Sequence, residues 1–350
     1  TIDQLLKEIK RVHFIGIGGS GMCPLAEILH AEGYEISGSD VNESETLARV
    51  RALGIPVSMP QKAENIEGAE LIVYSAAISA DNPEIVAAKE LNIPTMERSH
   101  LLGALTRQFD NVIGVSGTHG KTTVTSMITQ ILLLNKMEPT AVIGGKLPLI
   151  NSNGIAGKSE TMVCESCEFV DTFLQLSPDI TVLLNIDNDH LDYFGDINGA
   201  IKSFRKFAEN STGALIVNGD DENTMKAVEG LDKEIITFGW SEKNDYWAKD
   251  VHKLGGAKSG YTLMHKGEPI AEIELSIPGK HNILNSLACA AACIYVGMEP
   301  EQVAEHIDKF PGAGRRFEIL GEVNGVTIAD DYAHHPTELE ATLRAAKEMD

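Results

Sequence analysis

Residues 112–135 read VIGVSGTHGKTTVTSMITQILLLN, and this stretch decides the fold of the middle of the chain. The short apolar run Val112–Ser116 predicts a buried strand. The apolar residues of Thr123–Asn135 recur at helical spacing and predict a helix. A glycine-rich turn joins the two. Strands and helices that alternate in this way predict an α/β domain with a parallel sheet.

The turn, Gly117-Thr118-His119-Gly120-Lys121-Thr122-Thr123, predicts a phosphate-binding loop. Its backbone N–H groups would surround phosphates, Lys121 would contact the β- and γ-phosphates, and the Thr122 hydroxyl would bind Mg²⁺. The general pattern G-x-x-x-x-G-K-[ST] has a glycine where this chain has Val115, so the motif is a shorter variant. A plain strand–helix turn would not explain Lys121 and Thr122 directly after a second glycine. We therefore predict an ATP or GTP site.

Two further loops should face the same nucleotide. Glu165 follows the strand candidate Thr161–Cys164, and the segment Asn185-Ile186-Asp187-Asn188-Asp189-His190 follows the candidate Ile180–Leu184. In a parallel sheet, ligands bind beyond the carboxyl ends of the strands. Carboxylate and imidazole groups suit Mg²⁺ or Mn²⁺. Either Glu165 or Glu168 would serve as the carboxylate ligand, and we favour Glu165 because it lies nearer the strand end.

The rest of this region changes character. Strand candidates continue at 215–217 and 235–238, and polar and apolar residues then alternate on both sides of Lys266-Gly267, which predicts a hairpin of Tyr261–His265 and Pro269–Ile277. Helices are expected over Ile283–Val296 and Pro300–Lys309, and residues 311–314 (PGAG) are typical of a linker. The segment 279–285 (GKHNILN) opens the first of these helices. Taken alone it is better explained as an ordinary N-cap, and the alternative is that its amides reach a base or ribose.

The N-terminal part predicts a parallel sheet of its own, because short strands and helices alternate from residue 12 to about residue 96. Gly16-Ile17-Gly18-Gly19-Ser20-Gly21 matches G-x-G-x-x-G directly after a strand and before a helix. A pyrophosphate would sit on the N-terminus of that helix. Asp40 comes nineteen residues after Gly21 and is placed to bind a ribose hydroxyl. This pattern predicts a dinucleotide or nucleotide-sugar site.

The last 39 residues predict the beginning of a third domain. Arg315 and Arg316 would suit phosphate charge, and residues 330–336 (DDYAHHP) end one predicted element and begin a helix at Pro336. A strand is expected near Val326–Ala329. The helix would be amphipathic, with an apolar face formed by Leu339, Leu343, Ala346 and Met349. We expect this face to need a partner that the sequence does not supply.

Composition excludes several classes of protein. There are 29 Lys and Arg against 51 Asp and Glu, and the net charge of −22 disfavours general nucleic-acid binding. No apolar stretch is long enough to span a membrane, and the first eleven residues are charged, so we expect a cytoplasmic protein. The five cysteines do not suggest a disulfide framework. A zinc site is conceivable, but burial is the better explanation for Cys23, Cys164, Cys167, Cys289 and Cys293.

Taken in order, these motifs resemble the Mur ligase family: HFIGIGGSGM, SGSD, YSAAISADNPE, GTHGKTT, NIDNDHLDYF, GKHNILN, GRRFE and DDYAHHPTE. The resemblance runs from Val12 to about Leu343. It implies an α/β protein with a UDP-sugar-binding Rossmann-like domain (1–107), a central P-loop ATPase domain with an added hairpin region (108–311) and the beginning of a Rossmann-like C-terminal domain (312–350). More narrowly, it implies the member that joins L-alanine to UDP-N-acetylmuramate during peptidoglycan synthesis, using ATP and Mg²⁺ or Mn²⁺.

The resemblance also implies roles for individual residues. Lys121, Glu165 and His190 would be catalytic, with Thr122, Glu165 and His190 as metal ligands. ATP would be bound by Gly117, Thr118, His119, Gly120, Lys121, Thr122, Thr123, His281, Asn282, Asn285, Arg316 and Asp331. The UDP-sugar would be bound by Gly16, Gly18, Gly19, Ser20, Gly21, Met22, Ser39, Asp40, Ser75, Ala76, Ala77 and His119. Relatives carry a carbamylated lysine, for which Lys202 and Lys206 are candidates.

Three other functions compete with this interpretation. The recycling ligase of the same family, which attaches a ready-made peptide, has a similar late region, although Gly18-Gly19-Ser20-Gly21-Met22 looks more like the alanine-adding enzyme. An NAD-dependent oxidoreductase would leave Lys121 and Thr122 unexplained. A nucleotide-gated binding protein would hydrolyse ATP without needing sugar and amino acid together. Because the residues that hold the alanine carboxylate should lie beyond Asp350, we expect this chain to bind UDP-sugar and ATP but to ligate poorly.

Overall fold

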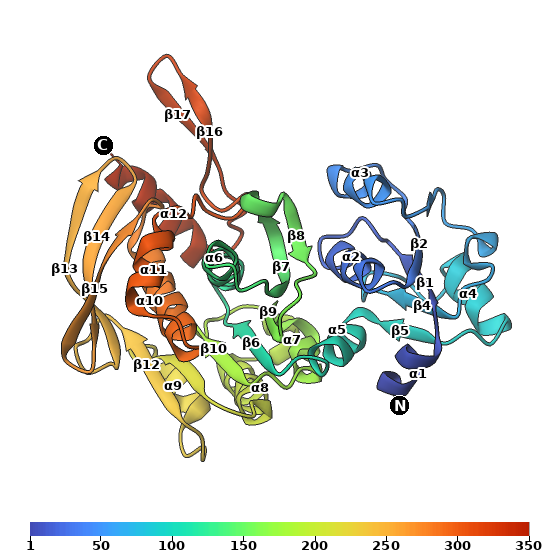
Figure 1. Cartoon of the computed structure of the whole chain (residues 1–350), viewed down its shortest axis with the longest axis horizontal. Helices are drawn as coiled ribbons and strands as arrows, with labels where there is room; N and C mark the ends of the chain where they lie inside the picture. The colour runs from blue at the N-terminus through green and yellow to red at the C-terminus, as the bar shows by residue number, and fades with distance from the viewer. Residues whose placement is uncertain (350) are drawn as a thin grey trace.

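A computed structural model describes residues 1–349, and its first sheet lies in the N-terminal part of the chain, on the right in Figure 1. All five strands are parallel, in the order β3-β2-β1-β4-β5. The strands are β1 (Arg11–Ile15), β2 (Glu35–Ser39), β3 (Val57–Ser58), β4 (Leu71–Tyr74) and β5 (Thr95–Glu97). The helices are α1 (Ile2–Glu8), α2 (Cys23–Ala31), α3 (Glu45–Ala52), η1 (Ala63–Ile66), α4 (Pro83–Glu90) and α5 (Arg98–Thr106).

Both faces of this sheet are covered, as a parallel sheet requires. Val12 and Phe14 of β1 pack with α2, α3 and α5 on one face, whereas Ile15 packs with α4 and η1 on the other. The side chains of successive strand residues point to opposite faces, which explains why one short strand serves two cores. The predicted parallel arrangement of this region is therefore confirmed.

The second sheet has ten strands in the order β15-β14-β13-β12-β11-β10-β6-β9-β7-β8. Its centre is parallel, and both ends are antiparallel. The parallel strands are β6 (Asn111–Ser116), β7 (Thr140–Leu147), β9 (Thr161–Glu165), β10 (Ile180–Leu183), β11 (Leu215–Asn218) and β12 (Ile235–Gly239). The end strands are β8 (Ser152–Ile155), β13 (Tyr246–Gly255), β14 (Lys258–His265) and β15 (Glu268–Leu275). The predicted hairpin corresponds to β14 and β15, with β13 as an additional strand.

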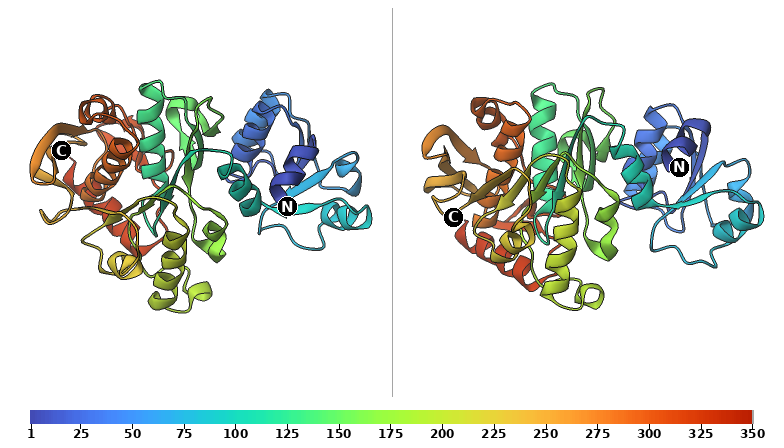
Figure 2. Two further views of the ribbon diagram at one scale, coloured as in Figure 1. Left: turned by 60° about the horizontal axis from the view of Figure 1, so that its bottom comes forward. Right: turned by 90° about the horizontal axis from the view of Figure 1, so that it is seen from below.

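Helices cover the two faces of the second sheet, and the views in Figure 2 show them on opposite sides. The apolar helices α6 (Lys121–Leu134), α10 (Lys280–Tyr295) and α11 (Pro300–Ile307) form one layer. The other layer contains η3 (Phe169–Gln175), α8 (Ile197–Asn210) and α9 (Glu222–Val228), with α7 (Leu191–Phe194) beside it. Helices α6 and α10 pack directly against each other, and their N-terminal parts meet where Gly120 closely approaches Asn285.

The first two parts of the chain touch through β8. Helix α2 packs against this strand, the Ser152 hydroxyl donates to Glu27 over 2.9 Å, and Arg49 donates to Asn153 over 3.2 Å. These contacts hold helices α2 and α3 of the first part against the edge strand β8 of the second sheet. In residues 1–349 there is no helix that is long and apolar enough to cross a membrane.

The third part consists of a hairpin, β16 (Glu318–Val323) and β17 (Val326–Asp330), and helix α12 (Pro336–Glu348). The structure agrees with the prediction that the apolar face of α12 has no partner, because Leu339 and Leu343 are exposed in the described part of the chain. Ala345 is the buried residue of this helix. The helix is instead docked through polar side chains, with Glu338 in contact with His119 of the phosphate-binding loop.

A buried polar network connects three elements of the first sheet. The His13 imidazole of β1 contacts the Glu84 carboxylate of α4 at 2.5 Å, and the Ser39 hydroxyl of β2 donates to the same carboxylate over 2.6 Å. The other ring nitrogen of His13 contacts the Ser37 hydroxyl at 2.8 Å. His13, Ser39 and Glu84 are each 0% exposed. A buried charge is tolerated only when it is paired and hydrogen-bonded, and this network meets that condition.

Candidate functional site

The phosphate-binding loop leaves β6 and enters α6 with two glycines in conformations that other residues rarely adopt. Gly117 has φ +140° and Gly120 has φ +88°. A Cβ atom on Gly120 would lie 2.7 Å from the Asn285 side-chain oxygen, and one on Gly117 would lie 2.9 Å from Leu184. Both glycines are therefore required by backbone conformation and by close packing. The loop brings the backbone N–H groups at the start of α6 to the carboxyl end of the sheet, where they form an anion site.

The loop after β10 interlocks with the phosphate-binding loop. The Thr118 N–H donates to the Asn185 carbonyl over 3.0 Å, and the His119 N–H donates to the Asn185 side chain over 2.8 Å. The Asn185 amide donates back to the His119 carbonyl over 3.0 Å, and the Asp187 N–H donates to the Thr118 hydroxyl over 2.9 Å. The sequence predicted that these two loops would meet, and the hydrogen bonds show that each fixes the backbone of the other.

Lys121 folds back over its own loop. Its ammonium donates to the carbonyls of Gly117 over 2.7 Å and Thr118 over 3.2 Å, and lies 2.9 Å from Oε2 of Glu168. Burial opposes the charge of Lys121, but the nearby carboxylates outweigh it, chiefly that of Glu168, and hold the pKa of Lys121 above its ordinary value. Lys121 is therefore a charged, nearly buried group beside the N-terminus of α6.

The two glutamates that the sequence left open take different places. Oε1 of Glu165 accepts a hydrogen bond from the Thr122 hydroxyl over 2.9 Å, and its Oε2 accepts one from the Gly144 N–H over 2.5 Å. Glu168 is instead the carboxylate that lies next to His190, at 3.7 Å, as well as next to Lys121. His190 has φ +53°, an uncommon backbone conformation for this residue type. The structure thus pairs Thr122 with Glu165, and His190 with Glu168.

These four side chains fit a divalent cation of the Mg²⁺ or Mn²⁺ type. Hydroxyl and carboxylate oxygens are the donors that such ions prefer, and imidazole is acceptable to Mn²⁺. One oxygen is especially suited: Oε2 of Glu168 is buried and, although it faces the Lys121 ammonium, it has no aligned hydrogen bond. Buried carboxylate oxygens are normally satisfied by a donor or a cation.

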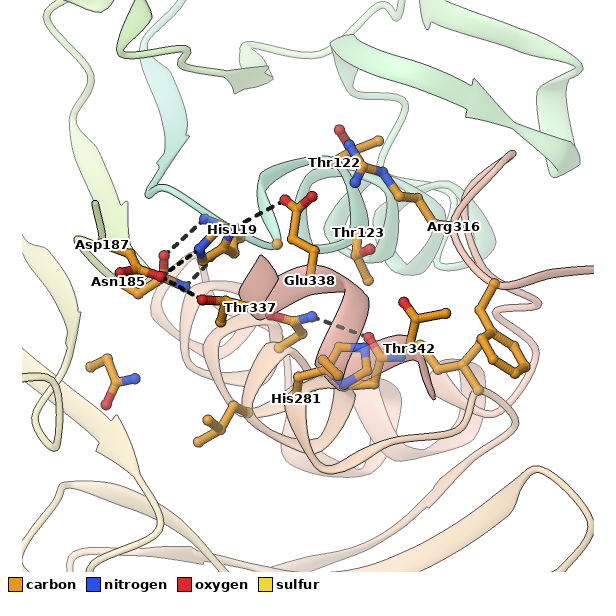
Figure 3. Close-up of a pocket in the computed structure, with 18 of the residues that line it drawn as sticks. His119, Thr122, Thr123, Asn185, Asp187, His281, Arg316, Thr337, Glu338 and Thr342 are labelled. Atoms are coloured by element: carbon orange, nitrogen blue, oxygen red, sulfur yellow. Dashed lines mark hydrogen bonds and ion pairs between the residues drawn. The ribbon is translucent and has the colours of Figure 1, made fainter. Parts of the chain in front are cut away.

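Beside the loop lies a cavity of about 410 Å³, shown in Figure 3. Of the predicted ATP-binding residues, those that line it are His119, Gly120, Thr122, Thr123, His281, Asn282, Asn285, Arg316 and Asp331. The other three, Gly117, Thr118 and Lys121, do not line it: the carbonyls of Gly117 and Thr118 accept from the Lys121 ammonium, which also contacts Glu168. Segments separated by more than 200 residues therefore meet around one cavity of the size that binds small ligands.

Several lining residues escaped the sequence analysis. Asn218 ends β11, Asp221 and Asn223 come shortly after it, and Thr337, Glu338 and Thr342 come from α12. The first group had a usable signal, because it is a polar loop at the carboxyl end of a parallel strand. The three residues of α12 had no such signal in the sequence, since their position at the cavity depends on how α12 packs against the rest of the chain.

Glu338 of α12 is held against the phosphate-binding loop by His119 (Figure 3). Nδ1 of His119 lies 3.1 Å from Glu338, and its Nε2 lies 2.9 Å from Asp187. Asp187 also accepts from the Thr337 hydroxyl over 2.9 Å. Burial opposes the charge on His119, but the two carboxylates raise its pKa. Burial likewise opposes the charge on Glu338, but the hydrogen bond from His119 lowers its pKa to about 2.

His119, Asp187 and His335 also lie close enough together to suggest a metal site, with ligand atoms within 4.8 Å of one another. Their hydrogen bonds favour another explanation. Both ring nitrogens of His119 contact carboxylates, which a protonated ring satisfies as a double donor, and Nε2 of His335 contacts the Asn188 carbonyl at 2.7 Å. This cluster is therefore an ionic contact that docks α12.

A titration of His119 tests this contact. The pKa of His119 is raised above its ordinary value of 6.5. The contribution of the protonated His119 ring to docking is therefore complete below pH 6.5 and is lost as the pH rises through the raised pKa. The contribution of Glu338 is complete above 4.5 and is lost as the pH falls through about 2. We expect docking to be strongest between about pH 4.5 and 6.5. Nuclear magnetic resonance should place the His119 midpoint above 6.5, and Glu338→Gln should lower it. The same midpoint in both proteins would contradict the contact, and Glu340→Gln is the control.

The predicted UDP-sugar residues other than His119 gather at the carboxyl end of the first sheet, whereas His119 lies on the phosphate-binding loop, where it contacts Asp187 and Glu338. The N–H groups of Gly16 and Ile17 donate to the Ser39 carbonyl over 2.8 and 3.0 Å. The Gly18 N–H donates to the Asp40 carboxylate over 2.9 Å. Asp40 therefore holds the turn, and the Ser39 hydroxyl is committed to Glu84 inside the sheet, so Ser39 acts on the turn through its backbone. Exposed positions on the turn and on the loop after β4 are Gly19, Ser20, Ala76 and Ala77, while Met22 is buried and Gly21 and Ser75 are partly buried.

Two groups of sequence candidates lie away from these contacts. Lys202 and Lys206 are exposed on α8. All five cysteines are free, and Cys289 and Cys293 are buried in α10. Cys164 lies near the end of β9 and Cys167 just after it, and burial raises the pKa of both thiols.

Comparison with known proteins identifies three consecutive matches to family models. These are the Mur ligase family catalytic domain over residues 11–110, the Mur ligase middle domain over residues 115–293, and the Mur ligase glutamate ligase domain over residues 315–350. The three models together cover both sheets and the C-terminal segment.

Curated relatives match nearly the whole chain. A UDP-N-acetylmuramate–L-alanine ligase of Caldanaerobacter subterraneus subsp. tengcongensis is 46% identical over 344 residues, which is 98% of this chain and 75% of that protein. A protein of the same name from Agathobacter rectalis is 47% identical over 339 residues, or 96% of this chain and 74% of that one.

Solved structures agree with these relatives. A UDP-N-acetylmuramate–alanine ligase from Thermotoga maritima has a TM-score of 0.86 and 31% identity, covering 97% of this chain and 77% of that one. A UDP-N-acetylmuramate:L-alanyl-γ-D-glutamyl-meso-diaminopimelate ligase from Neisseria meningitidis has a TM-score of 0.78 and 25% identity, covering 86% of this chain and 98% of that one.

Proposed function

The chain belongs to the Mur ligase family, and from this membership we propose that it is an ATP-dependent ligase that joins L-alanine to the lactyl carboxylate of UDP-N-acetylmuramate in peptidoglycan synthesis. The observation that carries the proposal is the identity of 41–47% to relatives of that name over nearly the whole chain. The interlocked loops at residues 117–122 and 185–190 support it, since they form an anion site beside a cavity.

The chemistry follows from the weakness of a carboxylate as an electrophile. An amine cannot displace an oxygen from it at neutral pH, so transfer of the γ-phosphoryl group of ATP to the lactyl carboxylate first creates a better leaving group. The alanine amine then attacks the acyl phosphate, and phosphate departs. Because two anions must meet, positive charge has to lie between them. Lys121 is suited to this task, since it is charged, nearly buried and 2.9 Å from Glu168.

We assign the other groups as follows. Thr122 with Glu165, and Glu168 with His190, would hold divalent cations, which neutralise phosphate charge when bound. His281, Asn282 and Asn285 would position the nucleotide from the start of α10, and Arg316 and Asp331 would do so from the C-terminal segment. Arg316 and Thr122 line the same cavity (Figure 3), and a guanidinium there would suit phosphate oxygens.

The sugar nucleotide would occupy the carboxyl end of the first sheet. The turn at residues 16–21 precedes α2, and its backbone is held by Ser39 and Asp40, so its free N–H groups are organised for a diphosphate before the ligand arrives. Ser75, Ala76 and Ala77 border the same edge after β4. The contact between α2 and β8 brings this edge towards the ATP site.

The function can be tested by following ADP formation while one substrate at a time is left out. We expect ADP to form only when UDP-N-acetylmuramate is present, and hydroxylamine to trap the acyl phosphate as a hydroxamate. Amide formation by this chain should be slow, and the amide that mass spectrometry detects should contain L-alanine in preference to the tripeptide L-alanyl-γ-D-glutamyl-meso-diaminopimelate. ADP formation that ignores the sugar would contradict a ligase, and preference for the tripeptide would favour the recycling enzyme. NADH binding would favour an oxidoreductase.

A further inference from the structure

Arg98 occupies a position that neither the motifs nor the assignments above explain. It is the first residue of α5 and directly follows β5, so it lies at the carboxyl end of the first sheet. The glycine turn at residues 16–21 lies at this same end, after β1. Helix α5 also packs against η3 of the second part of the chain, which places Arg98 where the two parts meet.

The guanidinium of Arg98 covers the last glycine of the turn. A Cβ atom on Gly21 would lie 3.2 Å from Cζ of Arg98 and 3.3 Å from both Nε and Nη1. Nη1 donates to the Gly21 carbonyl over 3.4 Å, which is a long hydrogen bond. Gly21 is not in a left-handed conformation, so its lack of a side chain serves this close approach. The turn and the arginine are thus built to fit each other.

This arginine has no carboxylate partner among residues 1–349, within 4.0 Å, although the chain carries 51 acidic residues. Six of the other arginines pair with a carboxylate: Arg11, Arg51, Arg107, Arg205, Arg315 and Arg344. Arg98 is partly buried and makes one long hydrogen bond with its five N–H groups. A half-buried guanidinium of this kind is well suited to an incoming anion.

We propose that Arg98 binds the diphosphate of the UDP-sugar, as a cation that closes over the glycine turn from the side of α5. Its guanidinium offers two parallel N–H donors, which match two phosphate oxygens. The diphosphate is favoured over the lactyl carboxylate because the guanidinium lies on Gly21, beside the N-terminal end of α2, where phosphate would be bound. The proposal rests on the function proposed above.

The test is equilibrium binding by calorimetry to the wild-type chain, Arg98→Ala and Arg98→Lys. The probes are UDP, UDP-N-acetylglucosamine, which has the diphosphate but no lactyl carboxylate, UDP-N-acetylmuramate and ATP. We expect Arg98→Ala to weaken all three uridine compounds by about 10- to 100-fold and to leave ATP unchanged. The affinity of Arg98→Lys for the uridine compounds should lie between those of the wild-type chain and Arg98→Ala, because lysine keeps the positive charge but lacks the two parallel N–H donors of the guanidinium. Gly21→Ala, which displaces the guanidinium, should weaken the same three ligands.

Arg51→Ala is the matched control, because Arg51 is an exposed arginine of α3 that pairs with Glu43. The Arg51→Ala variant should bind all four ligands normally. A loss confined to UDP-N-acetylmuramate would show that Arg98 binds the carboxylate and would overturn the proposal. Unchanged binding of UDP in Arg98→Ala, or an equal loss of ATP binding, would also overturn it. If the wild-type chain bound ATP but none of the uridine compounds, the proposed function itself would be wrong.

Discussion

Glu168→Gln is expected to lower the rate of sugar-dependent ADP formation by about 100- to 1,000-fold. The carboxylate of Glu168 faces both the Lys121 ammonium, at 2.9 Å, and the His190 imidazole, at 3.7 Å. Neutralising it removes the charge that holds Lys121 in place and one of the two groups assigned to a cation. The rate should fall and the Mg²⁺ concentration needed for half-maximal activity should rise, which a titration of Mg²⁺ at saturating ATP would measure.

Glu165→Gln is the informative comparison. Glu165 accepts hydrogen bonds from the Thr122 hydroxyl and the Gly144 N–H, and a glutamine oxygen would keep one of these. We expect a smaller loss of rate and a larger increase in the KM for ATP. Glu160→Gln, an exposed residue that precedes β9, should behave as the wild type. The assignment of His190 to Glu168 would be wrong if Glu165→Gln abolished activity while Glu168→Gln left the Mg²⁺ dependence unchanged.

Glu84→Ala should destabilise the first part of the chain by about 3–5 kcal/mol. The Glu84 carboxylate is 0% exposed and accepts from Ser39, while His13 contacts it at 2.5 Å. Removing it leaves the His13 ring and the Ser39 hydroxyl buried without their partner. Hydrogen exchange of peptides from β1, β2 and β4 in increasing urea would measure the loss, because the chain has two large cores and need not unfold in one step.

The double variant His13→Leu with Glu84→Leu distinguishes the net contribution of the pair to the free energy of unfolding from the destabilisation caused by leaving one buried partner unpaired. Replacing both buried partners with apolar side chains should recover most of the stability lost in Glu84→Ala. Glu90→Ala, on the exposed end of α4, is the control and should change the free energy of unfolding by less than about 0.5 kcal/mol. A loss of that small size in Glu84→Ala would show that the network contributes little to stability.

The strands that surround the site were predictable because their signals are local. Asn111–Ser116, Ile180–Leu183 and Leu215–Asn218 are short apolar runs, each followed by polar or glycine-rich residues, and their predicted positions agree with the structure to within a residue or two. The weaker elements were missed. Strands β7 and β8 lie in a stretch rich in glycine and asparagine, and β13 carries a long exposed polar segment. Periodicity alone does not identify strands of that composition.

The loop at residues 117–122 and its glycines were decided by the sequence itself, because backbone conformation and hydrogen bonding at a tight turn depend on neighbouring residues. What the sequence left open was contact between distant segments. Glu165 and Glu168 differ by three positions, and only the way β9 ends and η3 begins sends one to Thr122 and the other to His190. The docking of Glu338 on His119 and of Arg98 on Gly21 was likewise decided by tertiary packing, since each joins residues 77 or more positions apart and the neighbouring residues of Glu338 and Arg98 do not indicate the partner.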